Sequence, residues 1–121
     1  MQVDALVLAL YACVDEPWYL EQYPDVASSG RRGARHFVEQ GWREGRAPNA
    51  YFDTGWYAEQ YPAVREDDLN PLEHYLRWGW REGRHPHPAP AVRAALDQAR
   101  QESPFEVCPL LLLLSRPGSQ G

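Results

Sequence analysis

Residues 14–48 are VDEPWYLEQYPDVASSGRRGARHFVEQGWREGRAP, and residues 52–86 are FDTGWYAEQYPAVREDDLNPLEHYLRWGWREGRHP. The two stretches align without a gap at a constant offset of 38 residues, and 16 of the 35 aligned positions are identical. Two unrelated stretches of this length would share far fewer residues. The chain therefore contains an internal duplication, and the duplicated unit decides the fold.

The first half of each unit predicts a short helix. Asp15 and Asp53 stand at the N-cap position before a Trp-Tyr pair, where a carboxylate can accept from a free backbone N–H. Pro24 and Pro62 disfavour helical geometry at the tyrosine before them. We therefore expect a helix that breaks near residue 23 in unit 1 and near residue 61 in unit 2.

The second half of each unit predicts a longer amphipathic helix. Apolar residues recur at positions i, i+3, i+4, i+7 and i+8, namely Ala34, Phe37, Val38, Gly41 and Trp42 in unit 1 and Leu72, Tyr75, Leu76, Gly79 and Trp80 in unit 2. Glu39 with Arg43, and Glu73 with Arg77, are spaced as i, i+4 ion pairs. Gly45 and Gly83 stand where a left-handed C-cap favours glycine. Inside the helix, a glycine on the apolar face indicates close approach by a ring or a backbone.

The flanking segments complete an all-α fold, in which two tandem helix-pair repeats carry capping helices at both ends. Apolar residues at helical spacing predict a helix on each side of the repeats. The expected organisation is an N-terminal capping helix at 1–13, unit 1 at 14–51, unit 2 at 52–88, a C-terminal capping helix at 89–101 and a flexible tail at 102–121.

Composition limits the classes of function. The net charge is −5 and the pI is near 5.3, which disfavours non-specific binding to nucleic acid or to an anionic membrane, since both need a basic face. Arg31, Arg32 and Arg35 could form a local basic patch, although a solvated loop is the simpler interpretation. Cys13 and Cys108 could form one bridge or remain two free thiols. We expect no membrane span and no secretory signal, and neither the cysteines nor the N-terminus assigns a compartment.

The repeated pattern resembles a bacterial tandem helical repeat. The pattern is Trp-Tyr-Leu-x-x-Tyr-Pro-Asp-Val-Ala, then His-(Phe/Tyr), then Gly-x-x-Glu-Gly-Arg-x-Pro, and residues 14–88 carry it. Similar units are attached to glycosyltransferases, sulfotransferases and large secreted calcium-binding repeat proteins. The second copy departs from the pattern at Ala63 and Arg65. The resemblance implies an accessory module near surface-polysaccharide or secreted-protein systems, without the activities of the attached enzymes.

The residues that match between the units do not assemble into a catalytic pattern. His36 could act as a base with Glu44, but eight residues separate them, about 12 Å along a helix. His74, His85 and His87 could hold a metal, but no cysteine or carboxylate cluster completes the ligand set. We therefore expect no catalytic residue, no cofactor and no metal. The matching residues are interpreted as a structural signature: Trp18, Tyr19, His36, Gly41, Glu44, Gly45, Arg46, Trp56, Tyr57, His74, Gly79, Glu82, Gly83 and Arg84.

Tryptophan offers the candidate contact residues. Trp42 and Trp80 occupy equivalent positions, whereas Trp78 replaces Gln40 of unit 1 at the polar edge of its helix. Trp78 is the strongest candidate for surface contact, or it covers the C-terminal capping helix. The sequence thus predicts a non-enzymatic module that binds a protein partner, or itself, through a groove between the units. The alternative is a carbohydrate-binding accessory module that uses the repeated aromatic residues.

Overall fold

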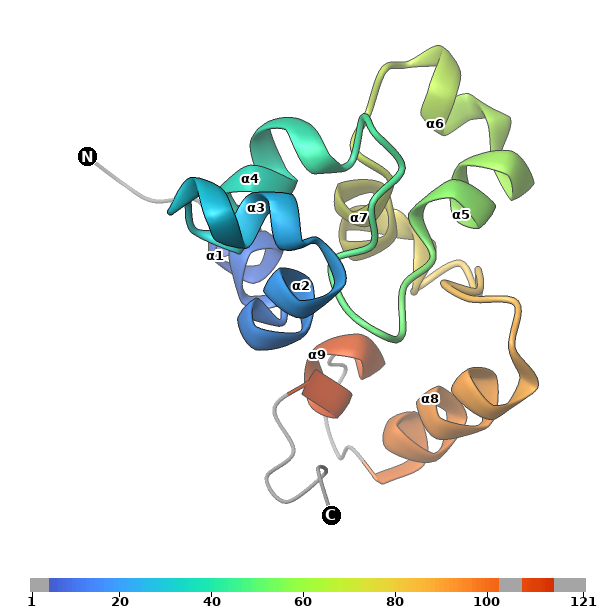
Figure 1. Cartoon of the computed structure of the whole chain (residues 1–121). Coiled ribbons are helices and arrows are strands. Elements are labelled where there is room, and N and C mark those ends of the chain that lie inside the picture. Colours follow the sequence, from blue (N-terminus) through green and yellow to red (C-terminus); the bar gives the residue numbers. More distant parts are fainter. Residues whose placement is uncertain (1–4, 103–107, 115–121) are drawn as a thin grey trace.

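The computed structural model describes residues 5–102 and 108–114, and their regular elements are helices (Figure 1). The described residues contain no strand, only an isolated bridge between Asn49 and Phe52. The predicted all-α class is confirmed. In chain order the elements are α1 (Ala5–Ala12), α2 (Glu16–Gln22), α3 (Pro24–Ser29), α4 (Gly33–His36), η1 (Phe37–Gly41), α5 (Thr54–Gln60), α6 (Pro62–Glu66), α7 (Pro71–His74), η2 (Tyr75–Gly79), α8 (Pro90–Glu102) and α9 (Pro109–Leu114).

The first helix of each unit begins and breaks where the sequence predicts. The Asp15 carboxylate accepts from the Trp18 N–H at 3.3 Å, and Asp53 accepts from Trp56 at 3.1 Å. At the breaks, Tyr23 has φ −125° and ψ 79°, and the residue at the second break, Tyr61, has φ −128° and ψ 79°. The following proline then begins α3 or α6, where its missing N–H costs no helical bond.

The second helix of each unit widens into a π-helical turn. Helix α4 continues as η1, and α7 continues as η2. In η1 the Trp42 N–H donates to the carbonyl of Phe37 at 3.2 Å, five residues earlier, and in η2 Trp80 donates to Tyr75 at 3.1 Å. Periodicity predicted an ordinary α-helix here. It cannot reveal a single widened turn, because such a turn hardly changes which residues face the core.

A tyrosine from the first helix explains the glycine inside the second. Tyr19 has no exposed surface, and its hydroxyl lies against Gly41, where a side chain would collide with it. Tyr57 is equally buried against Gly79. The predicted close approach to this glycine is therefore made by a tyrosine hydroxyl.

Both second helices end in the same cap. Gly45 has φ 79° and Gly83 has φ 78°, the left-handed conformation expected from the sequence. The Arg46 N–H donates to the Gly41 carbonyl at 2.9 Å, and the Gly45 N–H donates to Trp42 at 3.2 Å. These two bonds form a Schellman motif, which pairs carbonyls that the helix end leaves free.

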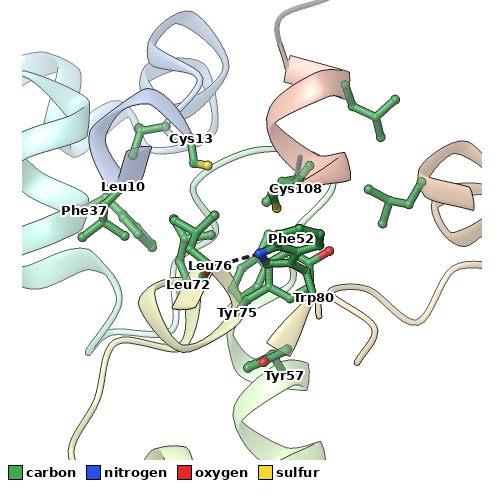
Figure 2. Close-up of a cluster of buried hydrophobic side chains, with 14 of the residues drawn as sticks. Leu10, Cys13, Phe37, Phe52, Tyr57, Leu72, Tyr75, Leu76, Trp80 and Cys108 are labelled. Atoms are coloured by element: carbon green, nitrogen blue, oxygen red, sulfur yellow. Dashed lines mark hydrogen bonds between the residues drawn. The ribbon is translucent and has the colours of Figure 1, made fainter. Parts of the chain in front are cut away.

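Helix α1 lies against the second helices of both units. It contacts α4 of unit 1 and α7 and η2 of unit 2. Leu10 and Cys13 join the buried cluster formed by both units (Figure 2). Leu10 is the buried residue of α1, whereas Val7, Leu8 and Tyr11 are exposed, and the predicted N-terminal cap stays a prediction.

The C-terminal segment forms two packed helices. Helix α8 lies where the sequence predicts a helix at 89–101, and it packs against α9. The predicted flexible tail is wrong for residues 108–114, because Leu110 and Leu113 of α9 are buried in the common core. Pro109 begins this helix, a position that tolerates proline. Residues 103–107 and 115–121 of the predicted tail lie outside the described residues.

Gly41→Ala should destabilise the fold by roughly 1–3 kcal/mol, because the new methyl group would meet the Tyr19 hydroxyl and force repacking. Urea denaturation measures the loss. The matched control is Gly55→Ala in α5, where an added methyl meets nothing within 4 Å. The control should be neutral or stabilising by up to about 1 kcal/mol. Equal effects of the two substitutions would contradict the close approach at Gly41.

Candidate functional site

The repeated histidines are bound to the buried tyrosines. Nδ1 of His36 lies 2.8 Å from the Tyr19 hydroxyl, and Nδ1 of His74 lies 2.7 Å from the Tyr57 hydroxyl. Burial lowers the pKa of both histidines and raises the pKa of both tyrosines. His36 is therefore bonded to a helix of its own unit.

Arg46 and Arg84, the arginines of the repeated signature, contact residues in the first half of their own unit. Arg46 pairs with Glu44 at 2.8 Å, forms two 2.9 Å bonds with Asp25 and lies over the Tyr23 ring at 4.7 Å. The hydrogen bond from Arg46 holds the pKa of Asp25 below its usual value. Glu44 is thus paired with an arginine, and the sequence hypothesis of a His36–Glu44 couple has no counterpart in these contacts.

The corresponding contacts of unit 2 are fewer. Arg84 pairs with Glu82 at 2.7 Å and lies over the Tyr61 ring at 4.3 Å. Unit 2 has Ala63 where unit 1 has Asp25, so Arg84 lacks the second carboxylate at that position. The units therefore match in their cores and differ in the charges at their surface.

The two units meet at a loop that sequence reasoning did not single out. Thr54 at the start of α5 donates to the Arg46 carbonyl at 2.8 Å. Asn49 is 1% exposed and donates to the Cys13 carbonyl at 2.7 Å. A buried amide needs such partners, so Asn49 fixes the loop between the units against the end of α1. A lone asparagine in a loop gives no sequence signal of this role.

A groove of about 260 Å³ opens at this junction. Unit 1 contributes the end of its second helix, and unit 2 contributes α5, α6 and the loop that follows. The floor is mainly small and apolar, and charged side chains stand on the rim. The residues of this junction groove are Trp42, Arg43, Gly45, Thr54, Gly55, Ala58, Val64, Arg65, Asp68, Leu69 and Pro71.

An ion pair between Arg43 and Asp68 spans the groove. The Arg43 Nη1 lies 2.9 Å from the Asp68 Oδ1, with side chains 55% and 72% exposed. The guanidinium of Arg43 also lies 4.3 Å from the Trp42 ring centroid. The predicted Glu39–Arg43 pair is wrong, because Glu39 binds Arg31 and Arg35 instead. The predicted Glu73–Arg77 pair forms at 3.0 Å.

Asp68 has a left-handed backbone conformation. Its φ is 50°, and no other non-glycine residue in 5–102 or 108–114 has a positive φ. The equivalent position of unit 1 is Gly30, with φ 78°. Unit 2 thus places a carboxylate where the local fold favours glycine, and that carboxylate reaches across the groove. The positive φ has a local cause, because the Asp68 N–H donates to the Arg65 carbonyl at 3.1 Å and the Leu69 N–H donates to the Val64 carbonyl at 3.0 Å, the Schellman bonds that end α6.

The three candidate tryptophans occupy different environments. Trp78 is 47% exposed, and its ring lies at a tilt 5.4 Å from the His74 ring and 5.7 Å from the Arg77 guanidinium. Trp42 is half-buried and lines the junction groove. Trp80 is only 8% exposed, and its indole N–H donates to the Leu76 carbonyl at 3.1 Å, so it lies in the core and offers a partner little surface.

The cysteines and histidines form no metal centre within the described part of the chain. No group of three or more His, Cys, Asp or Glu side chains is arranged there to hold an ion. Cys13 and Cys108 are both buried free thiols in the common core (Figure 2). Burial raises the pKa of Cys108 to about 11, so its reactive thiolate form is disfavoured.

Comparisons with protein-family models, curated proteins and solved structures found no match to this chain. Among the described residues, no helix is long and apolar enough to cross a membrane.

Buried His36 and half-buried His74 predict a pH dependence of stability. Their pKa values are lowered from the usual 6.5, so the unfolded chain binds protons more readily than the fold. The stability they confer is complete above about pH 6.5 and falls as the pH drops through that value. Urea denaturation at about pH 7.5 and about 5.5 measures it. The double variant His36→Gln, His74→Gln should lose most of this dependence; an unchanged dependence would assign it to other groups.

Asp68→Gly should leave the free energy of unfolding within about 0.5 kcal/mol of the original, because glycine relieves the left-handed backbone while an exposed ion pair is worth little. The control is Asp67→Gly, whose φ of −88° offers no such relief. The control should lose about 0.5–1 kcal/mol. A larger loss for Asp68→Gly than for Asp67→Gly would mean that the ion pair is kept for stability.

Proposed function

We propose that this chain is a non-enzymatic module of two tandem helix-pair repeats that binds a protein partner, or a second copy of itself, through the junction groove. The observation that carries the proposal is the groove itself, about 260 Å³ and lined by both units. Asp68 supports it, since its carboxylate stands on the rim at a conformational cost.

Matching contacts support the repeat arrangement. Four features recur at the same offset of 38 residues: the aspartate N-cap, the tyrosine at which the first helix ends, the tyrosine–histidine hydrogen bond and the left-handed glycine cap. Helix α8 supports a cap on unit 2, because Arg100 donates to the Trp80 carbonyl at 3.0 Å and Leu96 is buried. Repeat modules of this kind bind along surfaces built by neighbouring units.

The composition of the groove favours a protein partner. Protein interfaces combine an apolar centre with a polar rim, and tryptophan and arginine are enriched among the residues that dominate binding. Ala58, Val64 and Leu69 form an apolar floor, while Arg43 and Arg65 stand on the rim. Exposed Trp78 offers a second contact outside the groove. The resemblance to bacterial tandem repeats supports an accessory role in surface-polysaccharide or secretion systems.

Carbohydrate binding is the second candidate. Trp42 brings an aromatic ring to the groove beside Arg43 and Asp68, which together supply hydrogen-bond donors and acceptors. An apolar pocket with a few placed polar groups suits a small ligand such as a sugar. The same groove thus serves both candidates, and they differ in the occupant.

Arg65→Gln should weaken self-association or partner capture by roughly tenfold, about 1.4 kcal/mol, because it removes a rim charge of the groove. Sedimentation velocity over a range of concentrations measures self-association, and pull-down with the immobilised chain measures capture. Arg77→Gln is the charge-matched control outside the groove and should bind normally.

Three other outcomes are informative. Retention on a soluble polysaccharide that Arg65→Gln abolishes would favour the carbohydrate candidate. Loss of association in Trp78→Gln alone, with an unchanged melting temperature, would move the contact from the groove to Trp78. A chain that stays monomeric and whose captured proteins do not differ between Arg65→Gln and Arg77→Gln would contradict binding through the groove.

A further inference from the structure

Unit 1 carries a second hollow that the junction groove does not include. It has a volume of about 370 Å³ and lies where the turn after α3 meets the α4–η1 helix. Its lining residues are Gly30, Arg31, Arg32, Arg35 and Glu39, and we call it the arginine notch. The arginines that the sequence left as a solvated loop or a basic patch therefore surround one cavity.

Glu39 organises the notch. Its carboxylate binds Arg31 at 2.7 Å and Arg35 at 2.9 Å, one arginine on each oxygen. These hydrogen bonds hold the pKa of Glu39 below its usual value, so the carboxylate stays ionised at neutral pH. Three guanidinium groups and one carboxylate leave the notch with a net charge of +2 in a chain whose net charge is −5.

The repeat fold does not require these charges. At the equivalent positions unit 2 has Leu69, Asn70, Glu73 and Arg77, and its pair Glu73–Arg77 has the opposite order of charge. Arg32 directly precedes α4 and has no ion-pair partner among the described residues, whereas Asn70 caps α7 at the same place. The arginine cluster is thus a property of unit 1 alone.

We propose that the arginine notch binds a phosphate monoester group. Guanidinium groups donate pairs of parallel hydrogen bonds that match phosphate oxygens. A phosphate monoester carries a charge of about −1.5 to −2 at neutral pH, which balances the notch, whereas a single carboxylate would leave an excess of positive charge. Glu39 holds Arg31 and Arg35 in place, which lowers the ordering cost of binding.

The surroundings leave two sources for the phosphate. Helix α1 contacts α4, and Tyr11 lies close enough to Arg35 to influence it electrostatically. Val7 is 41%, Leu8 60% and Tyr11 38% exposed, so an apolar helix face lies next to the notch. A phosphorylated lipid would use both features, while a soluble phosphorylated metabolite would use the notch alone.

The first test titrates the whole chain with inorganic phosphate by calorimetry at constant ionic strength. We expect saturable binding that weakens about tenfold in Arg32→Asn, through loss of a charge-assisted hydrogen bond. That substitution copies unit 2 and is compatible with the start of α4. Arg77→Gln removes the same charge elsewhere and should bind like the original chain. No saturable binding, or equal weakening by both substitutions, would overturn the proposal.

The second test distinguishes the two sources. Phosphatidylcholine vesicles containing phosphatidic acid present a phosphate monoester, and vesicles with the same amount of phosphatidylglycerol present a diester. Binding to the first only, reduced by Arg32→Asn, assigns the notch to a lipid headgroup. Calorimetric binding without vesicle binding assigns it to a soluble phosphate ester. Equal binding to both vesicles, insensitive to Arg32→Asn, would overturn selectivity for the monoester.

Discussion

The hydroxyl of Tyr19 lies between the ring of His36 and the backbone of Gly41, and the other structural features of the unit are arranged around this contact. A buried hydroxyl requires a hydrogen-bond partner, and the histidine provides it. The hydroxyl can reach that position only because residue 41 has no side chain. One tyrosine thereby sets the distance between the two helices of the unit, at the place where the second helix widens into a π-helical turn.

The same constraint operates in unit 2 through Tyr57 and Gly79, so the two units pack their own helices in the same way. The glycine that admits the hydroxyl also provides the carbonyl that ends the helix, since Arg46 donates to Gly41. After this cap the chain passes Tyr23, whose hydroxyl accepts from the Ala47 N–H, and then reaches Asp53, the N-cap of the next unit. Close packing, helix termination and the direction of the following unit are thus linked through one small residue.

Outside this shared core the units differ, and both proposed sites include residues that differ between them. Asp68 replaces the glycine found at residue 30 and brings a carboxylate over the junction groove. Arg32 replaces the asparagine cap of unit 2 and adds a positive charge to the notch. The groove also uses Trp42 and Arg43, which match Trp80 and Arg81 of unit 2, whereas every residue that lines the notch differs between the units.

The sequence by itself determined the helical class, the aspartate caps, the break before each proline and the left-handed glycines, because each depends on interactions within a few residues. It also indicated that Gly41 admits a close neighbour, without naming the tyrosine. Tertiary structure alone decided that α1 crosses both units and that the leucines after Pro109 enter the core. It also decided that Arg43 pairs with Asp68, 25 residues away, and not with the nearby Glu39. Spacing along one helix cannot predict these contacts, because they depend on which surfaces the other helices leave uncovered when the chain packs.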